Sequence, residues 1–134
     1  MEDREELIRI LNEALGAEYG ALFLLPQHIA QVDDEETKRQ LKLIQDMELE
    51  HADKTAQMIF RLGAKPKADL PQLKVRSGVR EILEAHVAGE KQAIDIYTRA
   101  EAKCSDPVMK QQLSDLRRDE EGHQRLLERL LGRV

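Results

Sequence analysis

The 134-residue sequence predicts an all-α fold, a four-helix bundle with a long crossover between its second and third helices. Charged residues make up 35% of the chain and are mainly Glu, Lys and Arg, which are good helix formers. Aromatic residues account for only 3% and Trp is absent, so Leu, Ile, Val and Ala must build the core. Apolar residues recur three or four positions apart, as on one face of a helix. The length suits a single domain over residues 1–134.

The first two predicted helices are joined by a short acidic turn. The first helix covers about thirty residues, and Pro26 inside it should bend it, because proline lacks the backbone donor. Asp33 or Asp34 can cap the second helix, and Gly63 ends it. The apolar positions that indicate these helices are Leu7, Ile8, Leu11, Leu15, Leu22 and Leu25, then Leu41, Ile44, Ile59 and Leu62.

The last two predicted helices have clear start signals. Ser77 can cap the third helix. The sequence Ser105-Asp106-Pro107 predicts a sharp start for the fourth, because a capping side chain precedes a proline at the first helical position. The fourth helix should end near Gly132.

The segment AKPKADLPQLKVRS, residues 64–77, separates the second and third helices and contains two prolines. Extended, it can span roughly 40 Å at ~3.3 Å per residue. A thirty-residue helix is ~45 Å long. The segment can therefore travel nearly the length of a bundle, so that the second and third helices run parallel while the other neighbours run antiparallel.

Glutamate and histidine recur at matched spacings in the four helices. The second and fourth helices each carry a Glu-x-x-His motif, whose two side chains share one helix face. The first and third helices each carry a Glu that lies 30 residues before the Glu of the next motif. This pattern indicates a duplicated helical hairpin, about residues 1–63 and 77–132, packed about a pseudo-twofold axis. The six residues are Glu18, Glu48, His51, Glu90, Glu120 and His123.

Four carboxylates and two imidazoles would then converge in the middle of the bundle. Each buried, unpaired charge costs several kcal/mol. Two divalent cations would balance the four negative charges and replace the lost water with inner-shell oxygen ligands. A ligand set rich in oxygen, with only two nitrogens, favours iron or manganese. The spacing therefore predicts a dinuclear metal site.

Three motifs carry a resemblance to a known family. LGAEYGA at residues 15–21, EHAD at 50–53 and RDEEGH at 118–123 resemble those of bacterioferritins, within the ferritin-like and rubrerythrin-like superfamily. The resemblance covers nearly the whole chain and implies a ferritin-like bundle with two bound iron ions. It also implies terminal carboxylates from Glu18 and Glu90, bridging carboxylates from Glu48 and Glu120, and one metal each for His51 and His123.

The sequence departs from the family pattern at three places. Haem-binding relatives have a Met just after the second-helix ligand; here it is Leu49, so no haem is expected. An aspartate usually precedes both motif glutamates and orients a histidine across the site; Asp119 fills this role once, and Met47 occupies the other place. Many relatives also have a Tyr where this chain has Leu25. Tyr97 lies at the symmetry-related position, as a possible redox residue or an outer hydrogen-bond partner of a ligand.

The expected function is oxidation of Fe(II) by O₂ or H₂O₂ at a dinuclear iron centre. Two alternatives remain open: a non-catalytic Zn or Mn module that holds the bundle together, and a rubrerythrin-like peroxidase without a rubredoxin domain. A metal-free Glu/His network is a further alternative for the six residues. Glu13 rivals Glu18 as the first-helix ligand, and His86 could act as an outer partner one turn before Glu90.

Charge and cysteine content limit the other functions. The net charge of −5 argues against nucleic acid as a partner. The N-terminus MEDREEL is charged, and no apolar run approaches the ~20 residues of a membrane helix. Cys104 is the only cysteine, so neither an internal disulfide nor a thiolate metal cluster is possible. A cytoplasmic homodimer or larger homo-oligomer is expected.

Overall fold

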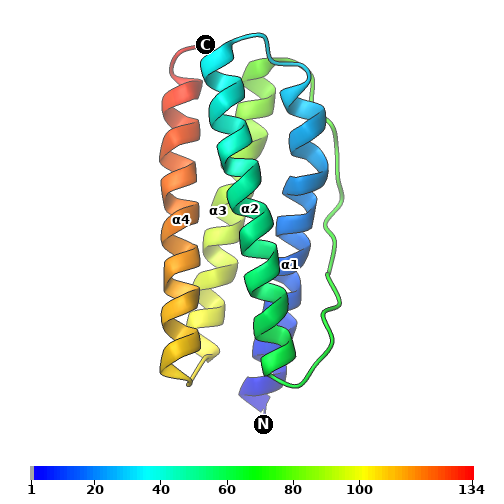
Figure 1. Cartoon of the computed structure of the whole chain (residues 1–134), viewed down its shortest axis with the longest axis vertical. Coiled ribbons are helices and arrows are strands. Elements are labelled where there is room, and N and C mark those ends of the chain that lie inside the picture. The colour runs from blue at the N-terminus through cyan, green and yellow to red at the C-terminus, as the bar shows by residue number, and fades with distance from the viewer. Residues whose placement is uncertain (1) are drawn as a thin grey trace.

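The computed structural model describes residues 2–134, and within this range every regular element is an α-helix (Figure 1). The elements are α1 (Glu2–Ile29), α2 (Glu35–Arg61), α3 (Val79–Lys103) and α4 (Pro107–Leu131). The predicted all-α fold with four helices is confirmed. None of these helices is long and apolar enough to cross a membrane.

The helix ends follow the capping signals in two cases and depart from them in one. The Asp34 side chain accepts a hydrogen bond from the Thr37 backbone N–H at the start of α2. Asp106 accepts one from Met109 in the same way, with Pro107 opening α4. The prediction for α3 is wrong, because Gly78 rather than a serine occupies the N-cap, without a side-chain hydrogen bond. Its φ of 88° lies in the left-handed region that favours glycine.

The four helices run along one long axis, and α2 and α3 point in the same direction (Figure 1). Helix α1 packs against α2 and α3, and α4 packs against α3 and α2. Residues 62–78, here called the crossover, run along the outside of the bundle next to α1 (Figure 1). Asn12 fixes the crossover to α1, because its side-chain oxygen accepts from the Lys67 N–H at 2.7 Å and its carbonyl accepts from the Asp69 N–H at 3.0 Å.

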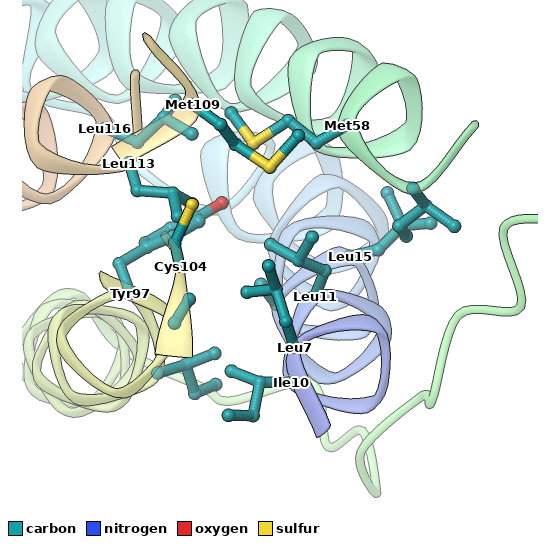
Figure 2. Close-up of a cluster of buried hydrophobic side chains, with 14 of the residues drawn as sticks. Leu7, Ile10, Leu11, Leu15, Met58, Tyr97, Cys104, Met109, Leu113 and Leu116 are labelled. Atoms are coloured by element: carbon teal, nitrogen blue, oxygen red, sulfur yellow. The ribbon is translucent and has the colours of Figure 1, made fainter. Parts of the chain in front are cut away.

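Two apolar clusters fill the bundle and leave a polar layer between them. The first cluster, near the N-terminal end of α1, includes Leu11, Met58, Tyr97 and Met109, which converge from all four helices (Figure 2). The second cluster lies toward the other end and includes Leu41. In each helix the predicted site residues lie between members of the two clusters. On each helix, one residue of the first cluster lies to one side of the site residues in sequence, and one residue of the second cluster lies to the other side. The flanking pairs are Leu15 and Leu25 in α1, Ala52 and Ile44 in α2, Ala93 and Val87 in α3, and Leu116 and Leu127 in α4.

The stability of the crossover contact can be tested at Gly16. A Cβ atom there would lie 1.8 Å from the Asp69 carbonyl oxygen, which is backbone. Gly16→Ala must displace the crossover, and we expect it to lower the free energy of unfolding by about 1–3 kcal/mol. The matched control is Gly89→Ala, whose Cβ meets no atom within 4 Å and which should gain up to ~1 kcal/mol of helix propensity. Urea unfolding measures both, and equal stability of the two variants would contradict the close contact.

Candidate metal centre

The structure brings all six predicted side chains together in the polar layer. Each Glu-x-x-His motif presents both side chains to the bundle interior, because residues three apart share a helix face. The single glutamates of α1 and α3 join them in the same layer. All six residues are at least 95% buried. Their residue exposures are 1% for Glu18, Glu48 and His51, 0% for Glu120, and 5% for Glu90 and His123.

The donor atoms form two overlapping groups of four, each with its atoms within 4.8 Å of one another. The first group contains Glu18 and His51, and the second contains Glu90 and His123. Two carboxylates, one from α2 and one from α4, belong to both groups. These shared residues are Glu48 and Glu120.

Both imidazoles point Nδ1 at the carboxylates. His51 Nδ1 lies 2.9 Å from Glu120 Oε1, 3.1 Å from Glu48 Oε1 and 3.3 Å from Glu18 Oε2. His123 Nδ1 lies 3.4 Å from one oxygen of each carboxylate in its own group. The two rings are stacked, with centroids 5.9 Å apart. One ring nitrogen of each histidine therefore faces three oxygens.

Most of these converging atoms make no hydrogen bond among the residues that the structure describes. Nitrogen and oxygen atoms of the cluster lie close together, yet these buried atoms have no hydrogen-bond partner. Buried polar atoms are normally paired, and leaving them unpaired is costly. A cation in each group would satisfy the oxygens and nitrogens together, so the donor set fits two metal ions. The atoms concerned are Glu48 Oε1, His51 Nδ1, Glu90 Oε2, Glu120 Oε1 and Oε2, and His123 Nδ1.

The electrostatics of the cluster show the same excess of negative charge. Burial and the nearby Glu48 carboxylate raise the pKa of Glu18 to about 8. Burial also raises the pKa of Glu90. Burial alone would lower the pKa of the His123 imidazole, but the Glu120, Glu48 and Glu90 carboxylates that face it outweigh this and raise that pKa to about 12. The pKa of His51 is raised in the same way. Without metal, protons therefore supply the positive charge that the carboxylates demand.

Further polar contacts hold the cluster from outside. His51 Nε2 lies 3.0 Å from Asp119 Oδ2, the contact predicted for this aspartate. The Tyr97 hydroxyl donates to Glu18 Oε2 at 2.9 Å, and the Thr55 hydroxyl lies 3.1 Å from the Tyr97 oxygen and can donate to it. Thr55 was not expected from the sequence, although it lies on the buried face of α2 about one turn after His51. Its hydrogen-bond partner, Tyr97, is 42 positions away in the sequence, so local patterns do not reveal the contact.

The rival residue Glu13 and two glutamates next to the motifs lie outside the cluster. Glu13 is bound by Arg99 at 2.8 Å, so it faces the surface and is not part of either donor group. Glu50 is exposed, and Glu121 pairs with Arg117 at 3.2 Å. Glu13 and Glu121 are therefore paired with arginine, and the exposed Glu50 lies 3.6 Å from Lys54.

His28 and His86 form a separate buried pair toward the other end of the bundle. Their rings approach to 2.7 Å between His28 Nδ1 and His86 Nε2. The Arg76 backbone N–H donates to His28 Nε2 at 2.9 Å, so the proton of a neutral His28 lies on Nδ1 and is donated to His86. Burial lowers the pKa of both histidines, with a smaller effect from the Arg76 charge on His28 and from His28 on His86, whose pKa falls to about 4. The pair also ties the crossover to α1 and α3.

This histidine pair should make stability fall in acid. An unfolded histidine has a pKa near 6.5, so below that pH the unfolded chain binds protons that the folded pair refuses. The free energy of unfolding therefore drops between about pH 6.5 and pH 4. His86→Gln keeps an acceptor for His28 but does not titrate, and we expect its loss over this window to be smaller by roughly 2–3 kcal/mol. Urea unfolding at pH 7 and pH 4.5 tests this, and equal losses in both proteins would contradict it.

A cavity of about 240 Å³ leads to the cluster from the side of the crossover. Small residues of α1 and α3, among them Ala17, Gly20 and Gly89, form its walls, and residues 71–74 of the crossover cover it. Lining residues from the cluster are Glu18, Glu48 and Glu90. The carboxylates can therefore be reached by small solutes although they are almost fully buried.

A family model described as a ferritin-like domain matches residues 8–134. The chain belongs to the ferritin-like family. Among characterised members, a bacterioferritin of Rhodobacter capsulatus is 33% identical, over 96% of this chain and 84% of the relative.

Solved structures of ferritin-like proteins superpose on most of this chain. A ferritin-like, diiron-carboxylate protein from Bacillus anthracis str. Ames has a TM-score of 0.89 and 30% identity, covering 98% of this chain and 99% of its own. The structure of the Rhodobacter capsulatus bacterioferritin has a metal-free dinuclear site and a haem iron. Its TM-score is 0.86 at 31% identity, and the match covers 96% of this chain and 84% of the bacterioferritin chain. The ferritin-like bundle is therefore shown by sequence and by structure.

Proposed function

We propose that this ferritin-like protein binds two iron ions in the polar layer and oxidises Fe²⁺ with O₂ or H₂O₂. The observation that carries the proposal is the cluster of buried oxygens and nitrogens without hydrogen-bond partners. Four carboxylates and two imidazoles suit two Fe²⁺ ions in number, charge and donor type. The similarity to a diiron-carboxylate protein over the full chain supports iron as the metal.

The roles of the ligands follow from the two donor groups. Glu18 and His51 would hold one ion, and Glu90 and His123 the other. The carboxylates common to both groups would bridge the ions, which makes them the most important ligands. When bound, the two Fe²⁺ ions supply one electron each to the oxidant. The bridging residues are Glu48 and Glu120.

The chain itself positions the ligands and controls protons. The apolar clusters on both sides bury the layer, which strengthens the charge interactions inside it relative to those at the surface. The raised pKa of His123 means that its Nδ1 carries a proton before metal binds. A metal ion must displace this proton, so loading releases protons to solvent. Asp119 keeps the Nε2 proton of His51 in place and leaves Nδ1 for the metal.

The test mixes metal-free protein with Fe²⁺ in air and follows the loss of Fe²⁺ with a colorimetric chelator. We expect loss much faster than in buffer alone, for at least two Fe²⁺ ions per chain. A rate equal to that of buffer, together with tight retention of Zn²⁺ or Mn²⁺, would instead support a structural metal module. Repeating the reaction anaerobically with H₂O₂ separates a peroxidase from an O₂-dependent ferroxidase.

Tyr97 is proposed to position Glu18 through its hydroxyl. The residue is fully buried, and burial raises the pKa of its phenol, so the hydroxyl stays protonated and donates to the carboxylate. Tyr97→Phe should slow Fe²⁺ oxidation by about 10-fold. This is the lower end of the 10–100-fold range that is typical when a contact that orients a metal ligand is lost. Rapid-freeze EPR during the reaction tests the redox alternative, because a tyrosyl radical in the wild type that is lost in the variant would show that Tyr97 also donates an electron. An unchanged rate would refute both roles.

We also propose that the chain forms a homodimer or a larger homo-oligomer and binds no haem. Tyr19 and Phe23, one turn apart on α1, are 42% and 54% exposed, and Phe60 on α2 is 62% exposed. Aromatic side chains are enriched in the contact surfaces of oligomers, so these exposed residues support the proposal. Leu49 carries no donor atom for haem iron. Light scattering gives the mass, and a monomer at micromolar concentration would refute the oligomer.

A further inference from the structure

The two histidines of the cluster have different partners on their outer nitrogens. Asp119 and Met47 hold corresponding positions, each directly before a bridging glutamate, and each reaches across to the histidine of the other helix. His51 Nε2 lies 3.0 Å from Asp119 Oδ2, whereas His123 Nε2 lies 3.3 Å from Met47 Sδ. A carboxylate therefore supports one imidazole and a thioether supports the other.

This difference matters for metal binding. A carboxylate is a charged acceptor that fixes the imidazole tautomer, orients the ring and makes the metal-facing nitrogen a better donor. A thioether sulfur is only a weak acceptor and carries no charge. Outer contacts of this kind typically change metal affinity by 10–100-fold. The imidazole of His51 is therefore the stronger ligand, although both rings face the same bridging carboxylates.

The terminal carboxylates also favour tighter binding at the position of His51 than at that of His123. Glu18 is 1% exposed, and its Oε2 accepts a hydrogen bond from the Tyr97 hydroxyl, which fixes its orientation. Glu90 is 5% exposed, and its Oε2 has no hydrogen-bond partner among the described residues. One terminal carboxylate is thus positioned in advance, while the other must be ordered when the metal binds, which lowers its contribution to affinity.

We propose that the two metal positions are unequal: the Glu18–His51 position binds tightly, and the Glu90–His123 position binds weakly and exchanges its ion. The proposal rests on the dinuclear site of the proposed function and deepens it. The retained ion is held by residues with fixed orientations. In the proposed oxidation, the ion at the weak position is the one replaced between turnovers. Met47 is the positioning residue that sets the difference, because it stands where a carboxylate would strengthen the second histidine.

The test is an anaerobic titration of the metal-free protein with Co²⁺, followed by calorimetry and visible absorbance. For the wild type we expect two binding steps whose dissociation constants differ by about 10–100-fold. Met47→Asp should tighten the weaker step by about 10–100-fold and bring the two steps together. Asp119→Asn keeps the size but removes the charge, and it should weaken the tighter step.

Two control variants separate this effect from simpler ones. Leu49→Asp adds the same charge two positions from Met47 on an exposed surface, and it should change either step by less than 3-fold if the contact with histidine is what matters. Met47→Leu removes the sulfur contact but keeps an apolar side chain, so it should leave the tighter step unchanged, whereas the weaker step should stay weak or weaken further. A crystal structure with one equivalent of Co²⁺, located by anomalous scattering, should show the ion beside Glu18 and His51.

The outcomes distinguish this proposal from the proposed function. Two equal steps in the wild type, or one equivalent of Co²⁺ divided evenly between both positions, would refute the inequality while iron oxidation could persist. A Met47→Asp protein that folds, as judged by circular dichroism, but binds both ions as the wild type does would refute the role of Met47. Failure to bind Co²⁺ and to oxidise Fe²⁺ would refute both proposals.

Discussion

Glu48→Ala and Glu120→Ala should each abolish iron oxidation, with a loss of at least about 100-fold in the rate of Fe²⁺ consumption. Each carboxylate belongs to both donor groups, so a single substitution weakens both metal positions at once. The expected loss therefore exceeds that from removing an outer contact, which typically costs 10–100-fold. Stopped-flow measurement of Fe²⁺ loss under saturating O₂ gives the rates.

The matched control for this pair is Glu50→Ala. Glu50 is separated by only two positions from Glu48 but is exposed and 3.6 Å from Lys54, so its removal should leave the rate unchanged. The ligand variants should still fold, because removing one of four clustered carboxylates relieves repulsion in the metal-free protein. A folded Glu48→Ala or Glu120→Ala protein that oxidises iron at the wild-type rate would show that the residue is not a ligand.

Metal loading should raise thermal stability by roughly 15–20 °C. An ion that binds only the folded state adds about 2.7 kcal/mol at a concentration 100 times its dissociation constant, so two ions add about 5 kcal/mol. For a chain of 134 residues, each kcal/mol shifts Tm by roughly 3–4 °C. The measurement is calorimetry under nitrogen with Fe²⁺ and, after addition of a chelator, without it.

The physical reason is the cost of the metal-free cluster. Burial and the nearby Glu48 carboxylate raise the pKa of Glu18 to about 8, so the buried layer tolerates its own negative charge poorly. Glu48→Ala should lose most of the metal-dependent increase in Tm, whereas Glu50→Ala should keep it. If Tm is the same without Fe²⁺ and with Fe²⁺ at about 100 times the expected dissociation constant, the cluster does not bind the ion in the folded state.

The sequence predicted the helices and the residues of the polar layer because both depend on local periodicity. A Glu-x-x-His motif presents two side chains to one face whatever packs against it, and the apolar positions around each motif show that this face is buried. The start of α3 was placed one residue early, at Ser77 instead of Gly78. The residue that caps α3 depends on the path by which the crossover returns to the bundle. Local residue preferences cannot predict that path.

Sequence alone determined the fold class and which side chains share the interior layer of this ferritin-like chain. Only the tertiary structure decided which atoms meet: Met47 with His123, Thr55 with Tyr97, and His28 with His86, across 76, 42 and 58 positions of sequence. Helical periodicity sets the face on which a residue lies. The axial offset between packed helices and the rotamers that fit there set its partner, and these arise from the packing of all four helices together.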